Sequence, residues 1–150
     1  MPGTYSQILL HIVFSTKRRQ PWIVADVARR LYPYLGGIIR AQGGALCAIG
    51  GVEDHVHVYI RWHADAAVAD LMRTLKSRSS NWVHETFRTH NLFAWQEGYS
   101  VFSVSKSREQ GVRKYIEAQG EHHRKESFDS ELLRLLRAHG VEFDEARVLD

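Results

Sequence analysis

Two histidines separated by a single residue are the first candidates for chemistry in this chain. His55 and His57 lie in the run DHVHVYIRW, residues 54–62, in which polar and apolar residues alternate. Such alternation predicts a β-strand with both imidazoles on the same face. Imidazole is the commonest metal-ligating side chain, and two on one rigid strand can converge on one ion if a third ligand comes from elsewhere. The same pattern also fits two histidines on a solvent-exposed strand surface.

A tyrosine and a glutamine later in the chain could complete such a site. Tyr115 and Gln119 are four residues apart, so on a helix their side chains project from the same face. A tyrosine hydroxyl is a nucleophile, and an amide carbonyl is a metal ligand. Each has a rival, because Tyr99 offers a second hydroxyl at the start of a predicted strand and His122 or His123 offers another imidazole. An aromatic and a polar residue at a helix boundary would give this pattern without any function.

The secondary structure expected around these residues alternates between strands and helices. Apolar and alternating runs predict strands at about 5–14, 45–49, 54–62 and 99–105. Apolar residues at helical spacing predict helices at about 25–42, 66–87, 107–119 and 129–139. The order β-α-β-β-α-β followed by helices predicts an α+β, ferredoxin-like fold, an antiparallel sheet with its helices on one face. The histidine face would then be open, and the helix holding Tyr115 could cover it.

Three local signals refine these boundaries. Gly50-Gly51 predicts a hairpin between the second and third strands. The segment SREQ, residues 107–110, has the spacing of a capping box, which predicts a helix that starts there and runs through Gln119. Pro33, inside the first predicted helix, argues against an unbroken helix at that position.

The composition is that of an ordinary globular protein. The chain has 150 residues, of which 44% are hydrophobic and 25% charged, so it can bury a core of its own. We expect one domain over residues 1–150, with a C-terminal helical extension from about residue 121. No apolar stretch reaches the roughly 20 residues of a membrane span and the N-terminus lacks a signal-peptide layout, so we expect a cytoplasmic protein. Cys47 is the only cysteine, which excludes an internal disulfide and predicts a buried structural thiol.

Positive charge is gathered in clusters, although the formal net charge is only +3. Clustered lysine and arginine side chains suit a nucleic-acid phosphate backbone, and solvated basic faces are the alternative. The residues predicted to contact phosphates are Lys17, Arg18, Arg19, Arg73, Lys76, Arg78, Arg113 and Lys114. Three aromatic residues, Trp82, Trp95 and Tyr99, could stack on bases or pack in the core.

Five segments, taken in order, resemble a known family of DNA transposases. They are HIVFSTKRR at 11–19, DHVH at 54–57, LKSRSS at 75–80, WQEGY at 95–99 and RKYIEAQ at 113–119. A histidine pair alone has little specificity, but five segments in this order are specific. The chain resembles the small single-tyrosine HUH transposases of the insertion-sequence 200/605 type, including their REP-associated relatives, where HUH denotes His, hydrophobic residue, His. Its tail beyond Gln119 is longer than the minimal family pattern and resembles genomic relatives outside mobile elements.

The resemblance implies a site and a reaction. His55, His57 and Gln119 would bind a divalent cation, Mg²⁺ or Mn²⁺, and Tyr115 would attack single-stranded DNA to leave a 5′-phosphotyrosine and a free 3′-hydroxyl. A tyrosine with an ordinary pKa near 10 needs a phosphate activated by a Lewis acid. Imidazole suits Mn²⁺ better than Mg²⁺. The family also implies hairpin DNA ends as the ligand and a homodimer in which the tyrosine helix of one subunit can complete the site of the other.

Two other functions fit parts of the same pattern. A noncatalytic or domesticated nucleic-acid-binding module on this fold would keep the basic clusters without needing a nucleophile. A zinc hydrolase would use the histidine pair and release its product without a covalent intermediate. The joint presence of His55, His57, Tyr115 and Gln119 favours the transposase enzyme, because a decayed copy has no reason to keep all four.

Overall fold

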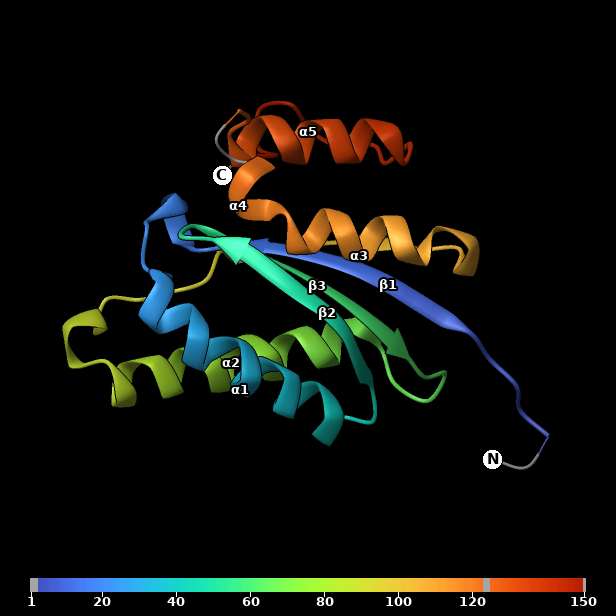
Figure 1. The fold of residues 1–150 in the computed structure, drawn as a ribbon, viewed down its shortest axis with the longest axis horizontal. Helices are drawn as coiled ribbons and strands as arrows, with labels where there is room; N and C mark the ends of the chain where they lie inside the picture. The colour runs from blue at the N-terminus through green and yellow to red at the C-terminus, as the bar shows by residue number, and fades with distance from the viewer. Residues whose placement is uncertain (1–2, 123–124, 150) are drawn as a thin grey trace.

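The computed structural model describes residues 3–122 and 125–149. A four-stranded antiparallel sheet in the order β2-β3-β1-β4 forms its centre (Figure 1). The strands are β1 Ile8–Ser15, β2 Ala45–Val52, β3 His55–Trp62 and β4 Ser100–Ser103. The predicted hairpin joins β2 to β3. Because β3 also pairs with β1, the histidine strand lies inside the sheet, where neighbours on both sides hold it rigid.

Helices cover both faces of this sheet (Figure 1). α1 Ala25–Ala41 and α2 Val68–Thr86 pack on one face, which confirms the ferredoxin-like βαββαβ order. The other face carries α3 Glu109–Glu117, α4 Gln119–His122 and α5 Phe128–Ala138. Short 3-10 turns lie at 17–19, 88–90 and 106–108. Within residues 3–122 and 125–149, no helix is long and apolar enough to cross a membrane.

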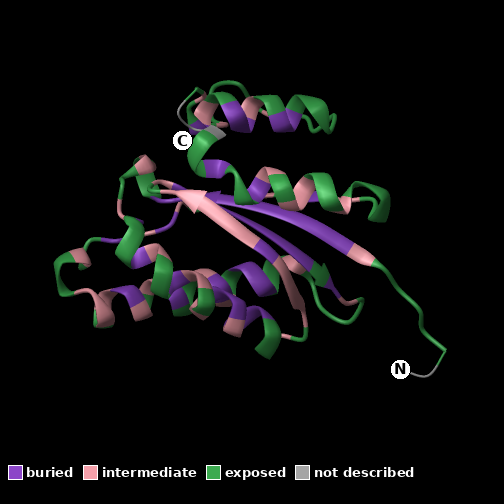
Figure 2. Ribbon diagram, viewed as in Figure 1, coloured by how far each residue is buried: buried purple, intermediate pink, exposed green. Residues whose placement is uncertain are grey.

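Alternation along β3 divides its side chains between these two helical layers. Val56, Val58 and Ile60 face α1 and α2 in the main core. His55 and His57 face the C-terminal helices and are 0% exposed. Nearly every residue of β1 and β3 is buried, so both faces of these central strands are covered, and Figure 2 shows β1 purple along most of its length. A solvent-exposed histidine surface is therefore wrong for this chain, because the C-terminal helices close over it.

The contact between α3 and β2 is close enough to require a glycine. A Cβ atom at Gly50 would lie 2.2 Å from the carbonyl oxygen of Ile116, so the helix backbone rests directly on the strand. Gly50 is also the register partner of His57. The residue before Ile116 is Tyr115, so this contact places the tyrosine over the histidine strand. Gly50, one of the two glycines that predict the hairpin, therefore also determines how closely α3 packs on the sheet.

The start and end of α3 differ from the predicted boundaries. Ser107 lies in the 3-10 turn, and its hydroxyl pairs with Ser105 at 2.9 Å instead of capping the helix. Glu109 begins α3, and its carboxylate accepts a hydrogen bond from Tyr59 at 2.8 Å. The helix ends at Glu117, so the continuous helix predicted through Gln119 is wrong.

Two smaller predictions also differ from the structure. Pro33 lies inside α1 without ending it, because Leu31 and Leu35 on either side are fully buried against the core. Cys47 is half-buried rather than buried, and it lies at a register shift of β2 between Leu46 and Ala48. Neither difference changes the position of the histidine strand.

Candidate active site

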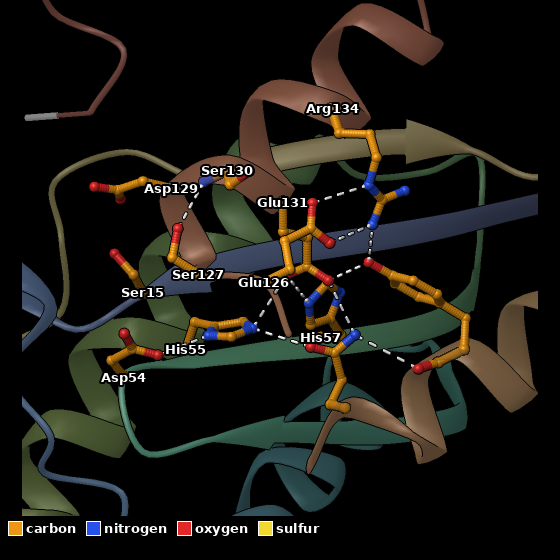
Figure 3. Close-up of polar contacts among 12 residues, drawn as sticks. Ser15, Asp54, His55, His57, Glu126, Ser127, Asp129, Ser130, Glu131 and Arg134 are labelled. Atoms are coloured by element: carbon orange, nitrogen blue, oxygen red, sulfur yellow. Dashed lines mark hydrogen bonds and ion pairs between the residues drawn. The ribbon is translucent and has the colours of Figure 1, made fainter. Parts of the chain in front are cut away.

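The two histidines of β3 converge on one carboxylate oxygen. His55 Nε2 lies 3.2 Å from Glu131 Oε1, and His57 Nε2 lies 3.1 Å from the same atom. Glu131 comes from α5, and all three side chains are 0% exposed. Figure 3 shows the imidazoles pointing toward Glu131 across the space between sheet and helix. Single ligand atoms of the three residues lie within 4.8 Å of one another, close enough to share one ion.

The second nitrogen of each imidazole is also held. His55 Nδ1 lies 2.8 Å from Asp54 Oδ1, and His57 Nδ1 lies 2.7 Å from His11 Nε2 on β1. Metal-ligating histidines regularly have such an outer partner, which fixes the ring and keeps the proton away from the ligating nitrogen. Both rings are therefore oriented with Nε2 toward the interior of the site.

Tyr115 and Gln119 reach the same place from the same chain. Gln119 Oε1 lies 3.1 Å from His55 Nε2, and the amide Nε2 donates to Glu131 Oε2 at 3.1 Å. The Tyr115 hydroxyl also donates to Glu131 Oε2, and Arg134 donates to the tyrosine oxygen at 2.9 Å. The break between α3 and α4 does not separate the two side chains. The structure thus brings together all four residues that the motifs single out.

The structure does not describe the side chains of the two rival third ligands, His122 and His123. His123 lies outside the described residues, and the side chain of His122 does as well. Gln119 is buried at 1% exposure and contacts the histidine pair directly, so it is the better placed of the candidates that the structure describes.

Sequence reasoning missed Glu131, although a signal was present. α5 has the sequence FDSELLRLLRA, in which Phe128, Leu132 and Leu135 form a buried apolar stripe at helical spacing. Glu131 lies within that stripe, one residue before Leu132. A carboxylate on the apolar face of an amphipathic helix is rare unless a partner compensates its charge, so the position marks a buried polar site.

Electrostatics tie these groups together. Burial alone would lower the pKa of His55, but the carboxylates of Asp54 and Glu131 outweigh it and raise that pKa to about 8. Burial and the neighbouring His57 lower the pKa of His11 to about 3, so His11 is neutral. The pKa of Glu131 lies below its ordinary value because both histidines outweigh its burial. Burial and the nearby Glu131 raise the pKa of Tyr115.

These donors fit a divalent cation. Two imidazole nitrogens, an amide oxygen and a carboxylate oxygen form a mixed set that suits Mn²⁺ well and Mg²⁺ less well. Without a cation, a proton on His55 helps to balance the buried carboxylate, and a bound cation would take the place of that proton. The site therefore has the charge, the ligand types and the closeness that a divalent cation needs.

Comparison with known proteins identifies the family. The family described as "Transposase IS200 like" matches residues 4–119, a segment that includes the histidine pair, Tyr115 and Gln119. The chain belongs to the IS200-like transposase family. Its function is that of a DNA transposase, an enzyme class that cleaves and rejoins DNA. Glu131 and Arg134 lie beyond the matched segment.

Individual relatives of the chain are also transposases. ISDra2 transposase TnpA of Deinococcus radiodurans is 28% identical over 124 residues, covering 78% of this chain and 87% of that protein. A crystal structure of a protein from Deinococcus radiodurans, assigned as a transposase, has a TM-score of 0.65 at 26% identity and covers 79% of this chain and 95% of that chain. A REP-associated tyrosine transposase bound to a REP hairpin shares the fold, with a TM-score of 0.62 at 11% identity over 82% of this chain and 73% of that chain.

Five of the predicted phosphate-contacting residues lie on the surface of the transposase. They are Lys17, Arg18, Arg73, Arg78 and Lys114, all exposed. Arg73 also pairs with an aspartate one turn away at 3.0 Å, a solvent-exposed ion pair that phosphate can displace at little cost. These five side chains are therefore accessible from solvent, and their contact with phosphates stays a prediction.

The other three basic side chains have partners within the protein. Arg19 pairs with Asp129 of α5 at 3.0 Å. Lys76 donates to backbone carbonyls of the loop 96–98, and burial lowers its pKa to about 8. Arg113 donates to a carbonyl of β2. These three side chains therefore help to hold the fold, and their contact with phosphates stays a prediction.

The aromatic candidates for base stacking lie in or against the main core, which α1, α2 and one face of the sheet form. Trp82 stacks on Tyr34 with ring centroids 4.7 Å apart. Trp95 is buried, and its indole nitrogen donates to Ser79 at 2.9 Å. Tyr99 packs against the same core, on the sheet face opposite the histidine pair, so it is not placed to replace Tyr115 as nucleophile.

Proposed function

We propose that this transposase is a metal-dependent single-stranded DNA endonuclease and strand transferase with Tyr115 as its nucleophile. One observation carries the proposal: the Tyr115 hydroxyl and the two β3 imidazoles meet at a single buried carboxylate, Glu131. A tyrosine that serves packing alone needs no metal-ligating side chains beside its hydroxyl. A tyrosine that attacks a phosphate bound to a cation needs them.

The chain's own residues divide the work. His55, His57 and Gln119 would hold Mg²⁺ or Mn²⁺, which as a Lewis acid makes a bound phosphate more electrophilic. Tyr115 Oη forms a bond to phosphorus while the bond from phosphorus to the 3′ oxygen breaks, giving a 5′-phosphotyrosine and a free 3′-hydroxyl. Arg134 Nη2, 2.9 Å from the tyrosine oxygen, favours the oxygen as it loses its proton.

Rejoining follows from the same geometry. The phosphotyrosine remains a phosphodiester, so a 3′-hydroxyl of another strand can attack it and release Tyr115. Bond making and bond breaking are matched in each step, so no nucleotide cofactor is required.

The DNA partner follows from charge and from similarity. We propose single-stranded DNA with hairpin ends, contacted by exposed basic residues such as Lys17, Arg18 and Arg78. A similar solved structure, the REP-associated transposase, is bound to a REP hairpin. The fold alone is shared at that identity, so the hairpin stays a proposal for this chain.

We also propose a homodimer, with the site assembled from one chain. Gln119 and Tyr115 approach the histidine pair of their own chain, and α3 rests on Gly50 of the same chain. A trans arrangement would require α3 to leave β2. Mixing His57→Ala with Tyr115→Phe separates the two arrangements, because only exchange between subunits restores one complete site.

The test is incubation of the protein with single-stranded DNA from the flanks of its locus and Mn²⁺, followed by denaturing electrophoresis. We expect a protein–DNA adduct that survives denaturation and is absent from Tyr115→Phe and His57→Ala. Cut DNA without an adduct would indicate a metal hydrolase instead. Hairpin binding without cleavage would indicate a noncatalytic binding module.

A further inference from the structure

We propose that Glu131 is a ligand of the same cation and also positions Tyr115, so that α5 is part of the active centre. The inference rests on the proposed metal site and adds a residue outside the segment that the family shares, which ends at residue 119. The histidine pair, Tyr115 and Gln119 all lie within that segment. Glu131 belongs to the C-terminal extension.

The two oxygens of Glu131 have separate tasks. Oε1 faces the histidine pair, 3.2 Å from His55 Nε2 and 3.1 Å from His57 Nε2. Oε2 accepts from the Gln119 amide at 3.1 Å and from the Tyr115 hydroxyl. A bidentate group in this position can contact a cation through one oxygen and hold the nucleophile beside it through the other.

The charge of Glu131 is what the other ligands lack. His55, His57 and Gln119 are neutral when they ligate a cation, so without Glu131 they bring no negative charge to a divalent ion. Mg²⁺ and Mn²⁺ favour carboxylate oxygens, and a buried carboxylate is stable only when a positive partner compensates it. Within the described residues, Glu131 is the carboxylate that the site itself buries at 0% exposure.

Packing at the start of α5 fixes Glu131 in place. Phe128 stacks on the His55 ring with centroids 4.4 Å apart. Ser127 caps the helix by accepting from Ser130 N at 3.2 Å, and Asp129 pairs with Arg19 at 3.0 Å. These contacts connect the first turn of α5 to the histidine strand and to the turn after β1. Glu131 lies in the same first turn, so its carboxylate is held before any ligand arrives.

The test measures Mn²⁺ binding to the full chain without DNA, by calorimetry and by electron paramagnetic resonance of the free ion. Glu131→Gln keeps the shape of the side chain but removes its charge, and we expect about tenfold or greater loss of Mn²⁺ affinity. Glu142→Gln removes an exposed carboxylate outside the site and should bind as the unmodified protein does. His57→Ala should lose binding altogether.

A second readout examines the contact with Tyr115. At Mn²⁺ concentrations that saturate each protein, adduct formation by Glu131→Gln should stay at least several-fold slower, because one amide oxygen replaces two carboxylate oxygens. Faster adduct formation would overturn the proposal, since it would make the carboxylate an obstacle to the reaction. Unchanged Mn²⁺ affinity in a folded Glu131→Gln protein would overturn it as well.

A further variant, Glu131→Asp, keeps the proposal testable if Glu131→Gln does not fold. Glu131→Asp keeps the charge and withdraws the carboxylate by one methylene group, so it should fold and still bind Mn²⁺ more weakly. Affinity equal to that of the unmodified protein would overturn the proposal. If the unmodified protein forms no DNA adduct but the Glu131 variants weaken Mn²⁺ binding, the proposed reaction fails while this ligand assignment stands.

Discussion

His57 Nδ1 lies 2.7 Å from Nε2 of His11, a buried residue on the neighbouring strand β1. Burial and the neighbouring His57 lower the pKa of His11 to about 3, so His11 is neutral and can accept a hydrogen bond through Nε2. His57 then carries a proton on Nδ1, which leaves Nε2 as the nitrogen that would bind a cation. A histidine here does what a carboxylate or backbone carbonyl does for many metal-ligating imidazoles.

His11→Phe tests this relationship, because it keeps a buried ring and removes the acceptor. We expect Mn²⁺ affinity to fall by about 10-fold to 100-fold, the usual effect of losing an outer partner. Calorimetry gives the affinity. His63→Phe, at the far end of the histidine strand, is the control and should leave affinity unchanged. Equal affinities for all three proteins would mean that His11 serves packing alone.

Gly50→Ala tests how α3 sets the position of Tyr115. The added Cβ would meet the Ile116 carbonyl oxygen at 2.2 Å, so α3 must move away from β2. We expect a loss of about 1–3 kcal/mol in the free energy of unfolding, measured with urea, and a larger proportional loss of DNA adduct.

Gly111→Ala is the matched control on the same helix. A Cβ there has nothing within 4 Å, and alanine is the better helix former. We expect it to raise the free energy of unfolding by up to about 1 kcal/mol and to leave adduct formation intact. The same substitution at two glycines should thus have opposite signs, and equal effects would contradict the close contact at Gly50.

Stability in EDTA should fall as pH rises from about 6.5 to 8. The pKa of His55 is raised to about 8 in the folded protein, so its protonated form contributes stability that is present below its unfolded pKa and lost as pH passes through 8. The loss is about 2 kcal/mol at most. Urea unfolding at pH 6.5 and 8.5 measures it, and His55→Gln should abolish the slope.

At lower pH the dependence of stability on pH reverses its sign, which gives a second prediction. The depressed pKa values of His11 and Glu131 mean that the unfolded chain takes up their protons first as pH falls, so stability should decline below about pH 6. Saturating Mn²⁺ should stabilise the protein more at pH 8 than at pH 6.5, because the ion competes with protons. A flat profile in EDTA would contradict the charge balance of the site.

Exposed and internally bonded basic residues should respond differently to mutation. Arg78→Gln should weaken DNA binding and reduce the slope of log affinity against log salt concentration by about 0.7. Arg29→Gln, exposed on α1 and outside the predicted clusters, should do neither. Lys76→Met should mainly lower the free energy of unfolding, because it removes the donor that holds the loop 96–98. An unchanged salt slope for Arg78→Gln would remove it from the DNA-binding surface.

The local pattern predicted much of this site. Alternation around His55 and His57 placed both imidazoles on one face, and the four-residue spacing kept Tyr115 and Gln119 close even though the helix breaks between them. The fold order followed from the succession of apolar periods. Each of these inferences depends on residues near one another in the chain.

Residues that depend on long-range pairing escaped prediction. His11 meets His57 only because β1 pairs with β3 in one particular register, and Glu131 lies 74 residues from His57. The role of Lys76 depends on a loop 20 residues further along the chain. Local periodicity carries no information on which strand pairs with which or which helix covers which face, so tertiary contacts decided these assignments.

The most direct measurement of the central claim locates the DNA attachment on the protein. Adduct formed with Mn²⁺ is digested with nuclease and protease, and the modified peptide is sequenced by mass spectrometry. We predict a nucleotide joined through its 5′-phosphate to Tyr115, and no such peptide from His57→Ala. Attachment at Tyr99 or at any other residue, or cleaved DNA with no modified peptide, would contradict Tyr115 as the nucleophile.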